Sequence, residues 1–428
     1  MQNKKHFLVS IVFFFFLYDV QLKGLPSLLS SRKLAVLFLI VMSVIQYRKG
    51  KGIVLRIYRL NDGIGAIYKN YLIGICCIWG YSILIAIFNS RLGNNYVDAK
   101  NLTFFLLYSV VAPFFFRYLF EDREALFKTL VYVGVIQSII IYALFVFPGF
   151  RILFDKLFET DARFGYTSIN VKVLGLGSGG AALSVLLFLS LYSLGYFLFD
   201  EKSVIANSLI YVFILGAALL AGRTGFFAGI LLGAVVVWKK LGMRMKKKAI
   251  AKLFTALLFV VVVMGVALGF AMKSETLSEK VIQTLSHIKI SETVNAHSSS
   301  SFLYVILKMN LPELSPELLY GAGYGRGLSL TGVNVQNDIG YVQRIFSLGI
   351  FFGIMFYLIN FICFWKISSK VKKKEFRFYY RILILVLFVL ELKEAFFYYY
   401  LVPSMILLIG FVAIREKTIK TNEKFIMN

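Results

Sequence analysis

Apolar runs recur along the whole sequence, and most of them are about 15 to 25 residues long. A run of that length crosses the ~30 Å hydrocarbon core of a bilayer as an α-helix, whereas a transmembrane β-barrel has alternating segments of about ten residues. Only 16% of the residues are charged, against about 25% in an average soluble domain. The sequence therefore predicts an all-α polytopic membrane protein.

We predict about twelve transmembrane helices and one long polar interruption. The expected spans are about 7–22, 34–47, 66–88, 102–120, 126–148, 173–199, 204–221, 224–238, 249–272, 339–365, 379–392 and 396–414. Residues 1–272 then form a membrane domain with spans 1 to 9, and residues 273–340 form a long extracytoplasmic loop with short surface helices at 277–288 and 302–309. Residues 341–428 form a second membrane domain with spans 10 to 12 and a cytoplasmic tail.

The positions of the basic residues predict the orientation of the chain. If the N-terminus is cytoplasmic, 30 of the 47 Lys and Arg residues fall inside and 17 outside, as expected for short cytoplasmic loops. The outer residues Lys23, Arg32 and Lys33 oppose this orientation. Both termini are therefore expected in the cytoplasm and the long loop outside. The net charge of +25 is explained by membrane orientation, and no soluble basic domain remains to bind nucleic acid.

The few soft-metal ligands are widely scattered. Two of the three cysteines are adjacent, Cys76 and Cys77, and Cys363 is distant, which is no spacing for a metal or a disulfide framework. With only three histidines, we expect no metal site and no cofactor. The apolar run that begins at Phe7 has no small-residue cleavage site after it, so we expect a retained helix.

Three arginines, Arg163, Arg223 and Arg326, lie in three different expected outer loops, each near glycines. A guanidinium group pairs with two phosphate oxygens at once and stays charged when partly dehydrated, which suits a diphosphate. The competing interpretation is that each arginine extends to lipid headgroups. Gly323 and Gly325 would add backbone amide donors to the same ligand, or they form a flexible turn before the next helix.

Asp338 lies where the long loop enters the tenth expected span. Its carboxylate would accept a proton as a general base, or Asn337 or Asp338 caps the helix that follows. Near the C-terminus, only eleven residues separate Arg381 from Lys393. Either the helix extends further toward its N-terminus, or the charged residues that begin at Glu391 lie below the outer membrane surface, where ionisable groups usually mark function.

Short motifs in this layout resemble the O-antigen and capsular polysaccharide polymerases of the Wzy type, which are related to the O-antigen ligases. The resemblance rests on Leu-Leu-Tyr-Gly-Ala-Gly-Tyr-Gly at 318–325, Asn-Asp-Ile-Gly-Tyr-Val at 337–342, Leu-Gly-Ile-Phe-Phe-Gly at 348–353, Ala-Gly-Arg-Thr-Gly at 221–225, the segment 161–170 and the pair Lys393-Glu394. The motifs are short, but the layout covers most of the chain. The ligases have a histidine where this chain has Asn337-Asp338, which argues against the ligase reaction.

The resemblance implies a metal-independent glycosyltransferase of the bacterial cytoplasmic membrane, which joins polyprenyl diphosphate-linked repeat units of O-antigen or capsule on the outer face. Its catalytic residues would be Asp338 as base, with Glu313 or Glu317 as alternatives, and Arg223 on the departing diphosphate. Substrate-binding residues would be Arg163, Arg326, Gly323, Gly325, Tyr341, Lys393 and Glu394. Its partners would be membrane lipids and a chain-length regulator and flippase of the same pathway.

Two other functions remain open at this point. A flippase for the same lipid-linked units would place binding charges near the bilayer midplane, often on paired interrupted helices. This chain instead concentrates its polar residues in one loop on one face, which favours an enzyme of the outer surface. A ligase would transfer the glycan to a different acceptor.

Overall fold

The computed structural model describes most of the helical part of the chain. The described residues are 2–26, 29–48, 64–88, 96–117, 119–120, 122–159, 175–176, 180–197, 204–241, 316–324, 327–328, 334–335, 339–398 and 401–426. They divide into two compact units, each built from two separate stretches of sequence. Unit 1 combines Met1–Ala35 with Glu124–Glu292, and unit 2 combines Val36–Arg123 with Thr293–Asn428.

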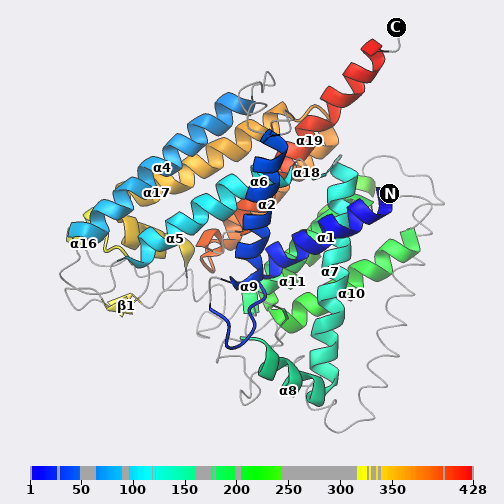
Figure 1. Cartoon of the computed structure of the whole chain (residues 1–428), viewed down its shortest axis with the longest axis horizontal. Helices are drawn as coiled ribbons and strands as arrows, with labels where there is room; N and C mark the ends of the chain where they lie inside the picture. Colours follow the sequence, from blue (N-terminus) through cyan, green and yellow to red (C-terminus); the bar gives the residue numbers. More distant parts are fainter. Residues whose placement is uncertain are drawn as a thin grey trace. The chain divides into compact units, whose positions relative to one another are not determined.

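Helices make up the described part of unit 1. Its helices are α1 (Gln2–Tyr18), α7 (Arg123–Val146), α8 (Pro148–Leu157), α9 (Gly180–Phe197), α10 (Val204–Ala221) and α11 (Arg223–Leu241), and α2 (Ser31–Arg48) begins in this unit (Figure 1). Helix α9 packs against both α10 and α11, and most of its side chains are buried. Close packing is possible because Gly225 of α11 lies on α9, where its amide donates to Ser184 Oγ at 3.0 Å.

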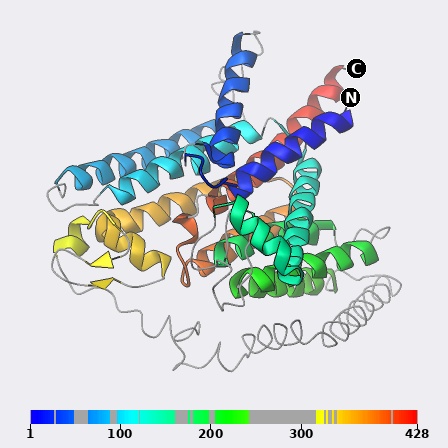
Figure 2. The same cartoon turned by 60° about the horizontal axis from the view of Figure 1, so that its bottom comes forward.

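Unit 2 contains α17, in which two helical stretches meet at a kink at Gly349. Its elements are α4 (Ile64–Phe88), α5 (Val97–Phe105), the π-helical η3 (Leu106–Val111), α6 (Ala112–Phe116), α16 (Pro316–Tyr320), β1 (Gly327–Leu328), β2 (Asn334–Val335), α17 (Gly340–Lys370), α18 (Lys374–Leu390), η5 (Phe396–Tyr398) and α19 (Leu401–Ile426). Helices α4 and α17 lie side by side (Figures 1 and 2). The two short strands form an antiparallel pair.

Six helices of the described part are long and apolar enough to cross a membrane: α4, the continuous Val97–Phe116 segment, α7, α9, α10 and α17. Two shorter apolar helical segments, Val9–Tyr18 and Leu401–Ile414, accompany them. The prediction of a multi-pass α-helical membrane protein is confirmed in this form. The expected span 249–272 and the expected surface helices of the long loop lie outside the described residues.

Several expected boundaries were wrong, and three of them are informative. The region from Gly149, expected as a loop, begins with helix α8, because Pro148 has the backbone angle required at the first turn of a helix. The first helix ends at Tyr18 rather than near residue 22, since Asp19 takes a positive φ of 32°. Helix α18 begins at Lys374, so it is longer than the eleven residues between the flanking charges suggested.

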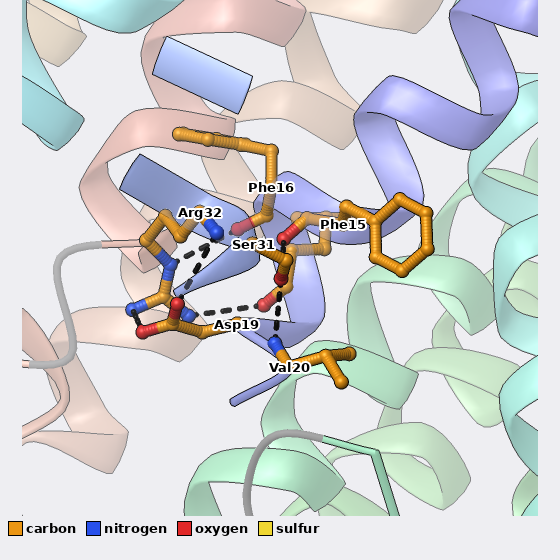
Figure 3. A network of polar contacts seen from close by, with 7 residues as sticks. Phe15, Phe16, Asp19, Val20, Ser31 and Arg32 are labelled. Atoms are coloured by element: carbon orange, nitrogen blue, oxygen red, sulfur yellow. Dashed lines mark hydrogen bonds and ion pairs between the residues drawn. The ribbon is translucent and has the colours of Figure 1, made fainter. Parts of the chain in front are cut away.

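A polar corner joins α1 to α2 (Figure 3). Arg32 donates from Nε to the Phe16 carbonyl at 3.0 Å and pairs with Asp19 at 3.2 Å. Ser31 Oγ donates to the Phe15 carbonyl at 3.0 Å. A cation at the last carbonyls of a helix satisfies acceptors that have no partner within the helix. Arg32, whose charge opposed the predicted orientation, therefore stabilises the C-terminal end of α1.

Candidate functional site

The residues that follow α16 bind a break in α17. The Ala322 amide donates to the Phe346 carbonyl at 2.9 Å, and the Gly323 amide donates to the Ser347 carbonyl at 3.0 Å. These carbonyls are accessible because Gly349, three and two residues later, has the non-helical angles φ 77° and ψ 162°. The break interrupts the regular hydrogen bonds of the helix, and the loop backbone replaces them.

Two glycines make this contact possible. Gly321 has φ 95°, and a Cβ atom there would lie 2.7 Å from the Ser347 carbonyl oxygen. At Gly349 a Cβ atom would lie 2.3 Å from the Leu319 carbonyl oxygen. Both positions combine a positive φ with backbone contact, so each requires glycine. The glycines of 318–325 and 348–353, singled out in the sequence as separate motifs, thus meet in space.

The described residues that flank residues 325–338, a stretch that we name the anchored segment, are both held on α17. The buried cluster beneath it is formed by Ala322, Ile339, Val342 and Phe346, with Tyr324 and Tyr341 packed against it. Ala322 precedes the segment and Ile339 follows it. Within it, β1 and β2 pair through Gly327 and Val335. The residues on either side of the segment are therefore both packed on the N-terminal part of α17.

A buried ion pair lies under the entry to the anchored segment. Arg344 donates from a terminal guanidinium nitrogen to Asp98 Oδ1 at 3.0 Å, and the two side chains are 2% and 0% exposed. The Asp98 amide also donates to the Gly323 carbonyl at 3.1 Å. The guanidinium carbon lies 4.7 Å from the centre of the Phe356 ring, a favourable cation–π arrangement. Helix α5 is thus joined to α17 and to the loop through one residue.

A buried carboxylate lies under the exit from the anchored segment. Glu391, which follows α18, is fully buried; its Oε1 accepts from the Tyr357 hydroxyl at 2.6 Å and its Oε2 from the Phe397 amide at 3.0 Å. Its backbone carbonyl accepts from the Gly340 amide at 3.0 Å. A Cβ atom at Gly340 would lie 2.1 Å from Glu391 Oε1. The start of α17 is therefore fixed by Glu391.

Glu391 provides a test of burial by pH. It lies beyond the end of α18 and outside the six spanning helices, and burial raises the pKa of its carboxyl to about 7, against the opposing effects of its hydrogen bonds and of Arg344. The folded state therefore holds this proton to a higher pH than the unfolded chain, whose pKa is near the ordinary 4.5. The stabilisation that comes from this bound proton is complete below pH 4.5 and is lost as the pH rises through about 7.

We expect the free energy of unfolding of the wild type, relative to Glu391→Gln, to fall by about 3 kcal/mol as the pH rises from 4.5 to about 7. The amide of the variant does not titrate, so its own stability supplies the baseline. Denaturant titrations in mixed micelles at a series of pH values measure the difference. A difference that stays constant over this range contradicts the assignment.

Arg223 is the first residue of α11 and is half-buried. Helix α10 ends at Ala221, and the Gly222 amide donates to the Ala218 carbonyl at 2.8 Å. A Cβ atom at Gly222 would lie 2.9 Å from the Gly180 carbonyl oxygen. The predicted tight helical hairpin is present, and it places the Arg223 guanidinium at one end of the α9–α10–α11 packing in unit 1.

The other predicted site residues have different positions. Tyr341 lies in the first turn of α17, donates its hydroxyl to the Phe388 carbonyl at 2.8 Å and packs against Tyr357. Lys393 and Glu394 are half-buried in the turn after α18. The residues that lie outside the described part of the chain are Asp338, Arg163, Arg326 and Gly325.

Two earlier interpretations concern the start of α17 and the Gly323 amide. The cap residue of α17 is Ile339, and the alternative cap residues Asn337 and Asp338 lie outside the described residues. The Gly340 amide donates to the Glu391 carbonyl. The Gly323 amide, expected to be a donor to a ligand, is already bonded to Ser347.

The sequence analysis missed Asp98 and Arg344. Asp98 follows Tyr96-Val97 and reads as an ordinary acidic residue at the start of a helix. Arg344 carried a usable signal, because it is a charged residue inside the apolar span expected at 339–365. Ionisable residues in such helices usually face the protein interior and have a partner.

The sequence matches no protein-family model and no curated protein sequence. The functional argument therefore depends on the residues of this chain and on the motifs quoted above.

Proposed function

We propose that this protein is a glycan polymerase that joins lipid diphosphate-linked oligosaccharide repeat units on the outer face of a bacterial cytoplasmic membrane. One observation carries the proposal: Ala322 and Ile339, the described residues on either side of the anchored segment, pack in one buried cluster with the N-terminal part of α17. Asp338 directly precedes the buried Ile339, and Arg326 directly precedes β1. Fixed supports of this kind favour the precise placement of a base and a phosphate-binding arginine.

The proposed reaction is a glycosyl transfer without a metal or cofactor. A hydroxyl of the incoming repeat unit attacks the anomeric carbon of the growing chain, and the bond from that carbon to the diphosphate oxygen breaks. Asp338 accepts the hydroxyl proton. Arg163, Arg223 and Arg326 stabilise the negative charge that grows on the departing diphosphate.

The remaining predicted residues would bind the substrate around this centre. Gly325 would contribute a backbone amide, and Lys393 and Glu394 would contact polar groups of the glycan. Tyr341 would contribute through its partly buried ring, since its hydroxyl is bonded within the protein. The buried Glu391 would position α17 rather than touch the substrate.

The proposed membrane layout has twelve spans and both termini in the cytoplasm. Beyond the six apolar helices, it uses α1, α2, α11, α18, α19 and the apolar segment 249–272. The long stretch 273–340 then lies outside the cell membrane, on the face where the lipid-linked units would meet. The bias of Lys and Arg toward the expected cytoplasmic loops supports this orientation.

The test uses a strain that lacks the gene, with its surface glycan separated by size. We expect the null strain to carry single repeat units and the wild-type gene to restore long chains. Arg223→Ala should fail to restore them at normal protein abundance, because the diphosphate loses a guanidinium in the transition state. A loss of at least about 100-fold in chain yield is expected for one such donor.

Lys239→Ala is the matched control. Lys239 lies near the other end of the same helix and is also half-buried, so the change removes the same charge from the opposite side of the membrane. It should restore long chains. Normal chains with Arg223→Ala would contradict the role of Arg223. Repeat units that accumulate on the cytoplasmic side would identify a flippase, and long lipid-linked polymer that never reaches its acceptor would identify a ligase.

A further inference from the structure

Helix α8 is short and amphipathic, unlike the long apolar helices of unit 1. At 1.5 Å per residue its ten residues extend about 15 Å, half of the hydrocarbon thickness. It begins directly where the spanning helix α7 ends, and Figure 1 shows it leaving that end at an angle. Pro148 causes the change of direction, since the preceding Phe147 takes an extended conformation of φ −108° and ψ 98°.

One side of α8 is an exposed apolar stripe. Phe150, Leu153 and Leu157 are 40%, 52% and 49% exposed, and at 100° per residue they lie within an arc of roughly 60°. Phe147, just before the helix, is 61% exposed. The adjacent side is buried through Phe154, which is 4% exposed. The stripe is therefore a separate, exposed face of the helix, and Phe154 makes the contact with the rest of unit 1.

A second connection holds α8 at the level where α1 ends. Leu22 and Phe158 form an isolated antiparallel bridge. The Lys23 amide donates to the Leu157 carbonyl at 3.0 Å, and the Lys23 ammonium group donates to the Asp155 carbonyl. The end of α1 and the end of α7, two apolar helices, are thus tied together at α8.

We propose that α8 lies in the headgroup layer of the bilayer, with Phe150, Leu153 and Leu157 inserted among the upper acyl chains. An amphipathic helix with aromatic and leucine residues on one face and basic residues beside it binds a lipid surface in this way. Arg151 and Lys156 have the alkyl length to reach phosphates while the stripe is buried. The occupant of the apolar stripe is lipid, because the helix starts where α7 leaves the hydrocarbon core.

The test measures depth in the bilayer and does not depend on glycan chemistry. Single cysteines are placed at Phe150, Leu153 and Leu157 in a chain whose three natural cysteines are replaced by alanine, and each carries a nitroxide label. The protein is reconstituted in vesicles of phosphatidylethanolamine and phosphatidylglycerol. Collisions with oxygen, which enters the acyl chains, are compared with collisions with a water-soluble nickel complex.

Two reference positions calibrate the measurement. Ile139, seven residues before the end of α7 and 54% exposed, reports an exposed site within the span, about 10 Å along the helix from that end. Ile152 is 38% exposed and lies roughly 130° around α8 from the stripe, so it is an apolar control on the side expected to face water.

We expect labels on the stripe to lie about 5–10 Å below the phosphates, shallower than Ile139, with Ile152 exposed to nickel. Stripe labels as accessible to nickel as Ile152 would overturn the proposal. So would stripe labels as deep as Ile139, which would make α8 part of a span. Labels shielded from both reagents would show a protein partner in place of lipid.

A second measurement avoids cysteine replacement. In the otherwise unchanged chain, Leu153→Asp should lower the thermal unfolding midpoint in the same vesicles, while Ile152→Asp should leave it unchanged. Equal effects of the two substitutions would contradict the insertion of the stripe.

Discussion

Arg344→Met is expected to destabilise the protein by about 3–5 kcal/mol, because it leaves the carboxylate of Asp98 buried without its cationic partner. Methionine preserves much of the aliphatic volume, so little of the loss comes from a cavity. The free energy of unfolding is measured by denaturant titration in mixed micelles. The loss should appear as an earlier midpoint with an unchanged slope.

Arg381→Met is the matched control for this change. The Arg381 guanidinium also lies over an aromatic ring, 4.4 Å from the centre of Trp365, and donates to Ser368 Oγ at 3.2 Å, but it is half-buried rather than enclosed. Its replacement should cost about 1 kcal/mol. Adding Asp98→Asn to Arg344→Met should recover part of the stability, because the buried charge is removed. A cost near that of the control would refute the importance of the ion pair.

Gly349→Ala is expected to cost at least about 3 kcal/mol. The backbone angles at this residue are accessible almost only to glycine, a strain of about 1–3 kcal/mol for any other residue. The added methyl group would also lie 2.3 Å from the Leu319 carbonyl oxygen, so α17 and the end of α16 must separate. The hydrogen bonds from Ala322 and Gly323 to α17 would be lost with that movement.

Gly80→Ala shows what the same substitution does without strain. Gly80 lies inside α4, and a Cβ atom there has no heavy atom within 4 Å. Alanine should stabilise this position by up to about 1 kcal/mol through its helix propensity. Opposite signs for the two glycines are therefore expected in one assay. If Gly349→Ala is as well tolerated as Gly80→Ala, the break in α17 is not required by the fold.

These two predictions concern the supports of the anchored segment and not the proposed chemistry. Arg344 pairs with Asp98, whose amide bonds to Gly323 just before the anchored segment. Gly349 exposes the carbonyls that hold Ala322 and Gly323. Each support is separate from the residues proposed to bind the diphosphate. A structural failure at either support would therefore remove glycan synthesis together with stability, whereas Arg223→Ala should affect synthesis alone.

The membrane character and many helix boundaries could be predicted from local sequence. The expected span 204–221 coincides with α10, since Gly222 and Arg223 interrupt the apolar run at that point. The tenth span was expected from residue 339, and α17 begins at Gly340. Length and hydropathy suffice for such predictions because each helix satisfies its own backbone hydrogen bonds in lipid.

Interactions between distant residues could not be predicted in this way. Asp98 and Arg344 are 246 positions apart, and no periodicity in either helix indicates that they meet. The break at Gly349 was equally hidden, because glycine is common in membrane helices for packing reasons. Its cause is the loop that binds there, which lies on a different stretch of sequence.

The sequence by itself determined that the chain enters a membrane as helices and where many of those helices fall. Only the tertiary structure decided that the glycine motifs at 318–325 and 348–353 are one contact, that Glu391 fixes the start of α17, and that Asp98 and Arg344 share a buried site. The physical reason is that the length of an apolar run is a property of one segment and can be read from that segment alone. The partner of a buried charge or of an exposed carbonyl is chosen by packing between segments.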